Sequence, residues 1–207
     1  MIEKLAYSLG RNDEEPNIDL AKELVQAHDL KGISEIVNGL EEKNLAGDCI
    51  KVLYEVGKLQ PSLISKYVNR FIDLLRSRNN RLVWGAMIAL SEITSLKPNE
   101  VFNNLDLILR IYKTGSVITI DNAISIFAEL VKADKEYEKI VFPIIIKHLE
   151  ECRHKEVGQH SERAFICVNK DNANLFKETL KKRVNELSDS QKKRVEKIIS
   201  KIEKGQY

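Results

Sequence analysis

Apolar positions follow a helical period along most of the chain, and one helical segment recurs. The segment LVWGAMIALSEI begins at Leu82, and related segments begin 37 residues earlier at Leu45 and 37 residues later at Thr119. A fourth related segment, VGQHSERAFICV, begins at Val157, 38 residues further along. Repetition with a period of 20–50 residues is typical of solenoids, in which stacked helical units share one continuous core. The pattern therefore predicts an all-α protein.

Within the first three segments, residues of the same kind stand at equivalent positions. A small residue recurs where two helices would cross, and a glutamate recurs six residues later, as in Cys49 with Glu55, Ala86 with Glu92 and Ala123 with Glu129. The small residues predict a close approach of adjacent helices. The glutamates predict hydrogen bonding from repeat to repeat, to backbone or lysine, rather than acid–base catalysis.

A second amphipathic helix is predicted after each of these segments. Two of these second helices follow prolines 37 residues apart, Pro61 and Pro98, and we expect them to span 62–78 and 99–112. Proline is accepted in the first turn of a helix because that turn leaves amides without partners. Later second helices are predicted over 135–151, where Pro143 predicts a kink or a late start, and over 172–187. The β-branched stretch SVITI resembles a strand, but the repeat register favours a helix.

These patterns predict about five helical pairs, eleven or twelve helices in all, in one domain that spans residues 1–207. Residues 45–187 hold the clear repeats. Residues 18–43 form a degenerate first pair, and residues 189–204 form a charged helix with one narrow apolar stripe. Terminal repeats of a solenoid are atypical because one of their faces meets water.

The recurrent segment resembles the first helix of a HEAT-type repeat of the armadillo/HEAT superfamily. The residues that carry the resemblance are an apolar residue, a small residue, an Ala-Leu pair, an acid and an aliphatic residue: Leu82, Ala86, Ala89, Leu90, Glu92 and Ile93. Asn80 and Val83 stand where the family often has Asp and Arg. The resemblance implies a right-handed α–α superhelix, and it implies an interaction scaffold that binds a partner along a concave face formed by the second helices.

Composition narrows the functional classes. Apolar residues make up 43% of the 207 residues and charged residues 31%, which suits long exposed helix faces, and the net charge is only +2. No phosphate-binding loop, nucleophile elbow or zinc-protease motif is present, so we expect no enzymatic activity and no cofactor. No apolar run is long enough to cross a membrane. Three cysteines, an odd number, predict reduced thiols in a cytoplasmic protein.

Basic residues recur on the second helices and form the predicted partner-binding set. They are Lys66, Arg70, Arg110, Lys147, Lys177 and Lys181. Such a ladder suits an acidic peptide or phosphates. Acidic residues interrupt it at Asp73, Asp106 and Glu151, which favours ordinary solvated helix faces as the simpler interpretation.

Three of the four histidines lie close to one cysteine in the sequence. His148 and Cys152 are four residues apart, so they share one face of a helix, and His154 and His160 follow. Nitrogen and sulfur donors are those that zinc prefers. The simpler interpretation is a helix C-terminus, whose partial negative charge favours basic residues such as Arg153.

The leading hypothesis is a non-catalytic protein–protein interaction scaffold that binds a protein or peptide. The alternative is a nucleic-acid-binding protein related to the HEAT-like DNA glycosylases that act on alkylated bases. Near-neutral charge and a single tryptophan, Trp84, argue against the alternative. We expect Trp84 to pack in the core.

Overall fold

The computed structural model describes all 207 residues and contains twelve α-helices and no strand. The helices are α1 (Glu15–Gln26), α2 (Leu30–Asn38), α3 (Ala46–Leu59), α4 (Val68–Leu74), α5 (Asn80–Ile93), α6 (Pro98–Phe102), α7 (Leu105–Thr114), α8 (Val117–Ala133), α9 (Lys135–Glu151), α10 (His154–Ala164), α11 (Ala173–Arg183) and α12 (Asp189–Glu203). The predicted all-α solenoid and the predicted number of helices are confirmed. None of these helices is both long and apolar enough to cross a membrane.

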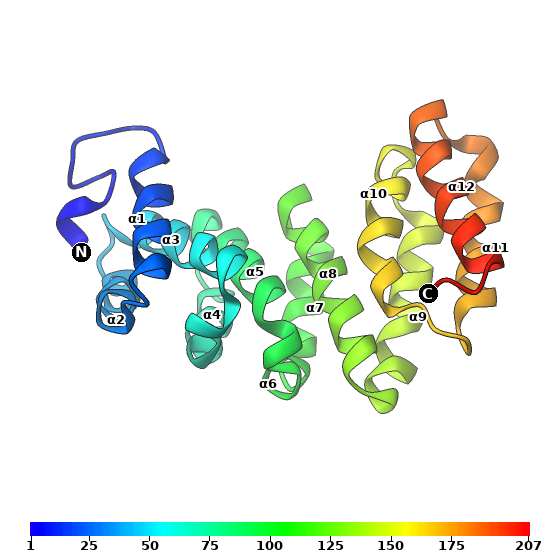
Figure 1. Ribbon diagram of the computed structural model, residues 1–207, viewed down its shortest axis with the longest axis horizontal. Helices are drawn as coiled ribbons and strands as arrows, with labels where there is room; N and C mark the ends of the chain where they lie inside the picture. The colour runs from blue at the N-terminus through cyan, green and yellow to red at the C-terminus, as the bar shows by residue number, and fades with distance from the viewer. The chain divides into compact units, whose positions relative to one another are not determined.

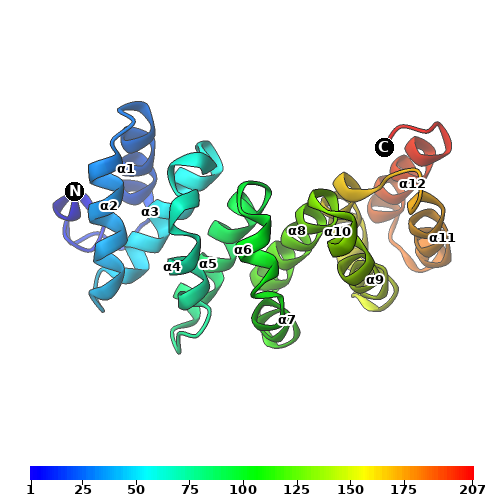
Figure 2. The ribbon, with the colours of Figure 1, turned by 90° about the horizontal axis from the view of Figure 1, so that it is seen from below.

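The chain forms two compact units, Met1–Ala123 and Ile124–Tyr207. In the first unit, α1 packs against α3 and α3 packs against α5, so these helices form one layer. The helices α2 and α4 pack on the other side, against α3 and α5 respectively (Figures 1 and 2). The recurrent segments of the sequence are thus the stacked first helices.

The spacing of apolar residues explains why α3 occupies the centre of this layer. Cys49, Val52, Leu53 and Val56 follow one another at helical intervals, and all four are fully buried. Full burial of each valine or leucine side chain stabilises the fold by about 1.5–3 kcal/mol. The helix has neighbours on both sides, so Ile50 is also fully buried.

Small residues let α3 and α5 approach closely, as the sequence predicts. Ala86 is fully buried, and the adjacent Gly85 lies directly against Ile50. A Cβ atom added at Gly85 would lie only 2.7 Å from Cγ1 of Ile50. The absence of a side chain at Gly85 is therefore a packing requirement.

The second helices of the first unit are more broken than the pattern predicts. The predicted helix 62–78 consists of two 3-10 turns, Pro61–Leu63 and Ser65–Tyr67, followed by α4. The predicted helix 99–112 is divided into α6 and α7 at Asn103 and Asn104. The side chain of Asn104 donates to the backbone carbonyl of Glu100 at 3.0 Å, and such local bonds compete with helical pairing.

The second unit has the same two-layer plan. The helix α10 packs against α12, while α9 packs against α11 (Figures 1 and 2). The helix α12 also covers α11, and it buries a narrow stripe formed by Val195, Ile198 and Ile202. Its remaining face is mostly charged and exposed, as expected for the last helix of a stack. The assignment of 1–207 as one domain with a cap at 189–204 stays a prediction.

Two local predictions concern the helices α8 and α9. The β-branched stretch opens the helix α8 at Val117, which confirms the choice of helix over strand. Pro143 lies inside α9, which begins at Lys135, so the helix does not start late. The ring of Pro143 is on the exposed side of this helix.

Replacement of Gly85 by alanine tests the close approach. Alanine favours a helix by about 1 kcal/mol relative to glycine, but its Cβ would overlap Ile50, and overpacking costs about 1–3 kcal/mol. We expect Gly85→Ala to lower the free energy of unfolding, measured by urea denaturation. In an Ile50→Ala background, the same substitution should be neutral or stabilising. An equal cost in both backgrounds would show that the two residues are not coupled.

Candidate functional site

The six predicted basic residues all lie on second helices or on the turns that lead into them. In the first unit, Lys66 is in the turn Ser65–Tyr67, Arg70 is on α4 and Arg110 is on α7. In the second unit, Lys147 is on α9, and Lys177 and Lys181 are on α11. Their role in binding stays a prediction.

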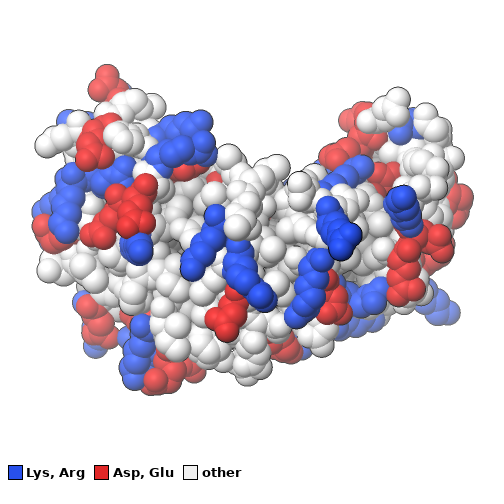
Figure 3. Space-filling model, turned by 180° about the vertical axis from the view of Figure 1, so that it is seen from behind, with Lys and Arg blue, Asp and Glu red and all other residues white.

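Most of these basic residues form ion pairs at the surface. In the first unit, Arg70 donates to Glu41 at 2.8 Å, and the Lys66 ammonium lies 4.9 Å from the centre of the Tyr67 ring. In the second unit, Lys147 lies 3.9 Å from Glu151, and Lys181 lies between Glu178 and Glu203. Exposed pairs of this kind contribute only about 0–1 kcal/mol, so a charged ligand can replace the partner carboxylate. On the face in Figure 3, basic and acidic side chains are mixed in small groups.

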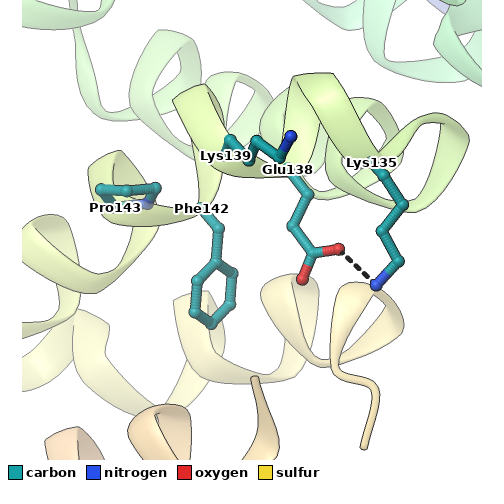
Figure 4. Close-up of a pocket in the computed structure, with 5 residues that line it drawn as sticks. All are labelled: Lys135, Glu138, Lys139, Phe142 and Pro143. Atoms are coloured by element: carbon teal, nitrogen blue, oxygen red, sulfur yellow. Dashed lines mark ion pairs between the residues drawn. The ribbon is translucent and has the colours of Figure 1, made fainter. Parts of the chain in front are cut away.

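A cavity of 330 Å³ opens along one face of α9 in the second unit (Figure 4). Its lining residues follow one another at helical intervals: Lys135, Glu138, Lys139, Phe142 and Pro143. The floor includes the buried ring of Phe142, which stacks on Phe176 of α11 with ring centres 6.5 Å apart. Lys147 lies one turn beyond Pro143 and continues the exposed side of the same helix. The cavity thus combines an apolar floor with a charged rim.

A smaller hollow of 240 Å³ adjoins this cavity and shares Lys135 and Glu138 with it. Here the carboxylate of Glu138 accepts hydrogen bonds from the side-chain amides of Asn169 at 3.1 Å and Asn172 at 2.8 Å. It also pairs with Lys135 at 3.0 Å, the interaction drawn in Figure 4. These contacts attach the start of α9 to the loop that precedes α11.

The environment of Glu138 favours its charged form. Burial alone would raise the pKa of this carboxyl, but the hydrogen bond from Asn169, the ion pair with Lys135 and the hydrogen bond from Asn172 together hold the pKa below its ordinary value. Glu138 is therefore a charged residue at the edge of both hollows, and it attaches α9 to the loop before α11.

The structure brings together three of the four predicted metal-ligand candidates. Nε2 of His148 and Nδ1 of His160 share a hydrogen bond of 2.8 Å, and the two ring centres are 4.8 Å apart. The donor atoms of His148, Cys152 and His160 all lie within 4.8 Å of one another. His148 and His160 are buried, and Cys152 is half-buried. We refer to these three residues as the His–Cys cluster.

His154 lies apart from the His–Cys cluster. It is exposed in the first turn of α10, where its Nδ1 donates to the backbone carbonyl of Glu186 at 3.0 Å. The helix α9 ends at Glu151, so His148 is in the last turn of one helix while His154 and Lys155 begin the next. The explanation by a helix C-terminus therefore applies to His148 alone.

Arg183 holds the end of α9 beside the His–Cys cluster. Its buried guanidinium donates to the carbonyls of Leu149 at 2.6 Å, Glu150 at 2.8 Å and Cys152 at 2.9 Å. These carbonyls would otherwise lack partners, because the last turn of a helix leaves its acceptors unpaired. Arg183 also pairs with Glu186 at 2.9 Å. The position of Cys152 is thus fixed by a side chain from α11.

The three thiols are chemically distinct. Burial raises the pKa of Cys49 to about 12, and burial likewise raises the pKa of Cys167 to about 12. Burial also raises the pKa of Cys152, but the positive charge of Arg183 opposes this effect. All three cysteines are free, and Cys152 is the one that is not fully buried.

Sequence reasoning did not identify the α9 cavity. Its residues are an ordinary mixture of lysine, glutamate and apolar side chains, and the one visible signal was the proline inside a helix.

Trp84, expected in the core, is only partly buried, and the centre of its ring lies 6.3 Å from that of Tyr54. Glu55, one of the recurrent glutamates, pairs with Lys51 and Lys58 of its own helix at 2.9 Å each.

Comparison with known proteins supports the fold. No protein-family model matches the sequence, and no curated protein matches it. Among solved structures, an engineered protein is 16% identical over 100% of this chain and 98% of its own, with a TM-score of 0.65. A designed armadillo repeat protein in complex with the peptide (KR)4 is 13% identical, covers 91% of this chain and 86% of its own, and has a TM-score of 0.65.

A third similar structure is a computationally designed armadillo repeat protein for modular peptide recognition. It is 12% identical over 88% of this chain and 85% of its own, with a TM-score of 0.64. At these identities the likeness concerns the fold, which is the armadillo/HEAT-like helical repeat fold that the recurrent segments predict.

Replacement of Glu138 by glutamine tests how much its contacts with the loop before α11 stabilise the fold. Glutamine keeps an oxygen that can accept from Asn169 and Asn172, but it loses the negative charge that strengthens these hydrogen bonds and pairs with Lys135, at a cost of about 1–2 kcal/mol. We expect a lower free energy of unfolding at pH 7, measured by urea denaturation. Because the folded-state pKa of Glu138 is depressed, its contribution is present above the unfolded-state pKa of about 4.3 and is lost as the pH falls through the folded-state value. The difference between the two proteins should therefore shrink in acid.

The exposed Glu136 on the same helix provides the matched control. Glu136→Gln should change the free energy of unfolding by less than about 0.5 kcal/mol at either pH. Equal effects of the two substitutions would contradict a specific role of Glu138.

Proposed function

We propose that this chain is a non-catalytic scaffold that binds an extended, acidic peptide segment of a protein partner on its second helices. In the second unit, the binding surface comprises the α9 cavity with Lys147, Lys177 and Lys181. In the first unit, Lys66, Arg70 and Arg110 supply basic side chains of the same kind. The α9 cavity is the observation that carries the proposal.

The shape and lining of the cavity support a peptide as the ligand. Its five lining residues lie on one face of α9, so the cavity follows a helix rather than forming a deep chamber. Phe142 and Pro143 offer apolar surface to one side chain of a bound segment. Affinity of an extended segment comes from several modest contacts of this type, with a small number of buried anchors contributing most.

The weakly paired basic residues of α9 and α11 favour acidic side chains in the bound segment. Lys147 is exposed, and its distance of 3.9 Å from Glu151 makes a weak pair. Lys177 is likewise 3.8 Å from Glu178. Carboxylates of a partner can displace these weak local pairs, and complementary charge also raises the association rate.

Similar folds support a peptide-binding role by analogy. One similar structure is a designed armadillo repeat protein in complex with the basic peptide (KR)4. The second helices of this chain carry basic residues, so we infer that the charge of its ligand is the opposite. Fold alone does not determine function, so the residues around the cavity carry the proposal.

Fluorescence anisotropy with labelled peptides tests the proposal. A peptide that alternates Glu with Leu should bind the full chain, and a peptide in which Lys replaces Glu should not. The double substitution Lys147→Glu with Lys181→Glu should weaken binding of the acidic peptide by about 10-fold or more, because two attractive contacts become repulsive. A higher salt concentration should weaken binding of the acidic peptide to the unsubstituted protein more than to the double variant.

Lys193→Glu is the matched control, since Lys193 is exposed on α12 of the same unit. It should leave the affinity for the acidic peptide within about 2-fold. Equal binding of the two peptides, or an equal loss with Lys193→Glu, would refute a specific surface. If labelled duplex DNA bound instead, with a steep dependence on salt, the chain would be a nucleic-acid-binding protein.

A further inference from the structure

We propose that the His–Cys cluster is a zinc(II) site, with Nε2 of His148, Sγ of Cys152 and Nδ1 of His160 as its protein ligands. The site lies where α9 ends and joins α10, and it is independent of the proposed peptide-binding surface. A bound ion would link these two helices.

The backbone already places the three donors at suitable positions. His148 and Cys152 are one helical turn apart at the end of α9, and His160 comes from the facing side of α10. Zinc lies about 2.0 Å from nitrogen and about 2.3 Å from sulfur in tetrahedral sites, so its donors are about 3.3–3.7 Å apart. The nitrogens, now 2.8 Å apart, need to separate by about half an ångström. The thiol needs to approach by about 1 Å from the present limit of 4.8 Å. Side-chain rotations supply movements of this size.

The proton balance of binding is simple. The imidazole that now donates the hydrogen bond between the two rings moves its proton to its other ring nitrogen, so both facing nitrogens offer lone pairs. The Cys152 thiol releases its proton to solvent and binds as thiolate. The ion therefore exchanges two hydrogen bonds, the one between the rings and the weak one from the Cys152 thiol to the Leu149 carbonyl, for three coordinate bonds without any redox step.

Burial and access both fit a metal site. His148 and His160 are 7% and 0% exposed, so their rings are already ordered by packing and lose little freedom on binding. Cys152 is half-buried and provides the route by which the ion enters. Its backbone carbonyl is held by Arg183 at 2.9 Å, which fixes the residue that carries the thiol.

The neighbouring arginines do not leave an excess of positive charge. Arg183 pairs with Glu186 at 2.9 Å, and Arg153 pairs with Glu156, the buried acid on α10. Two cations and two carboxylates therefore balance around the cluster before the thiolate and the ion are added.

The donor set selects the kind of metal. Two imidazoles and one thiolate suit zinc, whereas magnesium and calcium require oxygen ligands. Three protein ligands leave a fourth position for water, the arrangement of zinc sites with an open coordination position.

Titration of the reduced, metal-free full chain with zinc chloride tests the proposal. Isothermal titration calorimetry should show one zinc ion per chain, and thermal unfolding should shift to higher temperature with zinc. Cobalt(II) chloride should give an intense thiolate-to-cobalt charge-transfer band in the near ultraviolet, and zinc should abolish it. No saturable binding at one ion per chain, or cobalt binding without that band, would overturn the assignment.

Cysteine substitutions make the test specific. Cys152→Ser should abolish the cobalt band and weaken zinc binding by more than about 100-fold, because loss even of a residue that only supports a ligand costs 10–100-fold. Cys49→Ala is the matched control, since Cys49 is buried in the first unit. It should retain both the band and the affinity.

His148→Gln removes a second ligand and should also abolish the band. Circular dichroism of each variant confirms that it is folded, and Cys152→Ser is the decisive variant because its side chain is only half-buried. Unchanged zinc affinity in folded Cys152→Ser protein would overturn the proposal, as would loss of the cobalt band in Cys49→Ala.

Discussion

Each helical pair in this fold has more apolar surface than it can bury by itself, and stacking of the first helices resolves this constraint. The helix α3 shows the principle, because its apolar residues are buried on two sides, by α1 and by α5. Stacking at this distance requires small residues, and Gly85 meets Ile50 directly. The hydrophobic effect is not directional, so complementary shape selects one arrangement among many. The exposed side chains of the second helices take no part in this stacking, so their identity is not constrained by it.

That freedom explains why the candidate sites lie on α9 and its neighbours. Phe142 faces Phe176 and fixes α9 on α11, while Lys139, Pro143 and Lys147 are exposed and contribute little to the core. The start of α9 is fixed by Glu138 and its end by Arg183. A helix that is anchored at both ends and in its middle presents its exposed side chains in a defined geometry, which is the requirement for selective binding.

Periodicity predicted the fold because burial repeats with the same period as the sequence. The first helices appear where the recurrent segments stand, and even the β-branched start of α8 follows the register. Breaks in the second helices were missed because single side-chain hydrogen bonds, such as that of Asn104, determine them. The candidate site was only partly predictable. Helical spacing linked His148 with Cys152, but the contact with His160 depends on how α9 and α10 pack, and the separation of His154 depends on where one helix ends.

Arg183 has a consequence for the cooperativity of unfolding. In repeat proteins, each unit usually interacts with its nearest neighbours alone, so segments at an end can fray one at a time. Here a side chain from the last turn of α11 donates hydrogen bonds to three carbonyls of the α9 terminus. Loss of α11 would remove the donor that these carbonyls share, and loss of α9 would remove three acceptors of the guanidinium. The two helices are therefore expected to open as one foldon, with shared hydrogen-exchange protection across more than thirty residues of intervening chain.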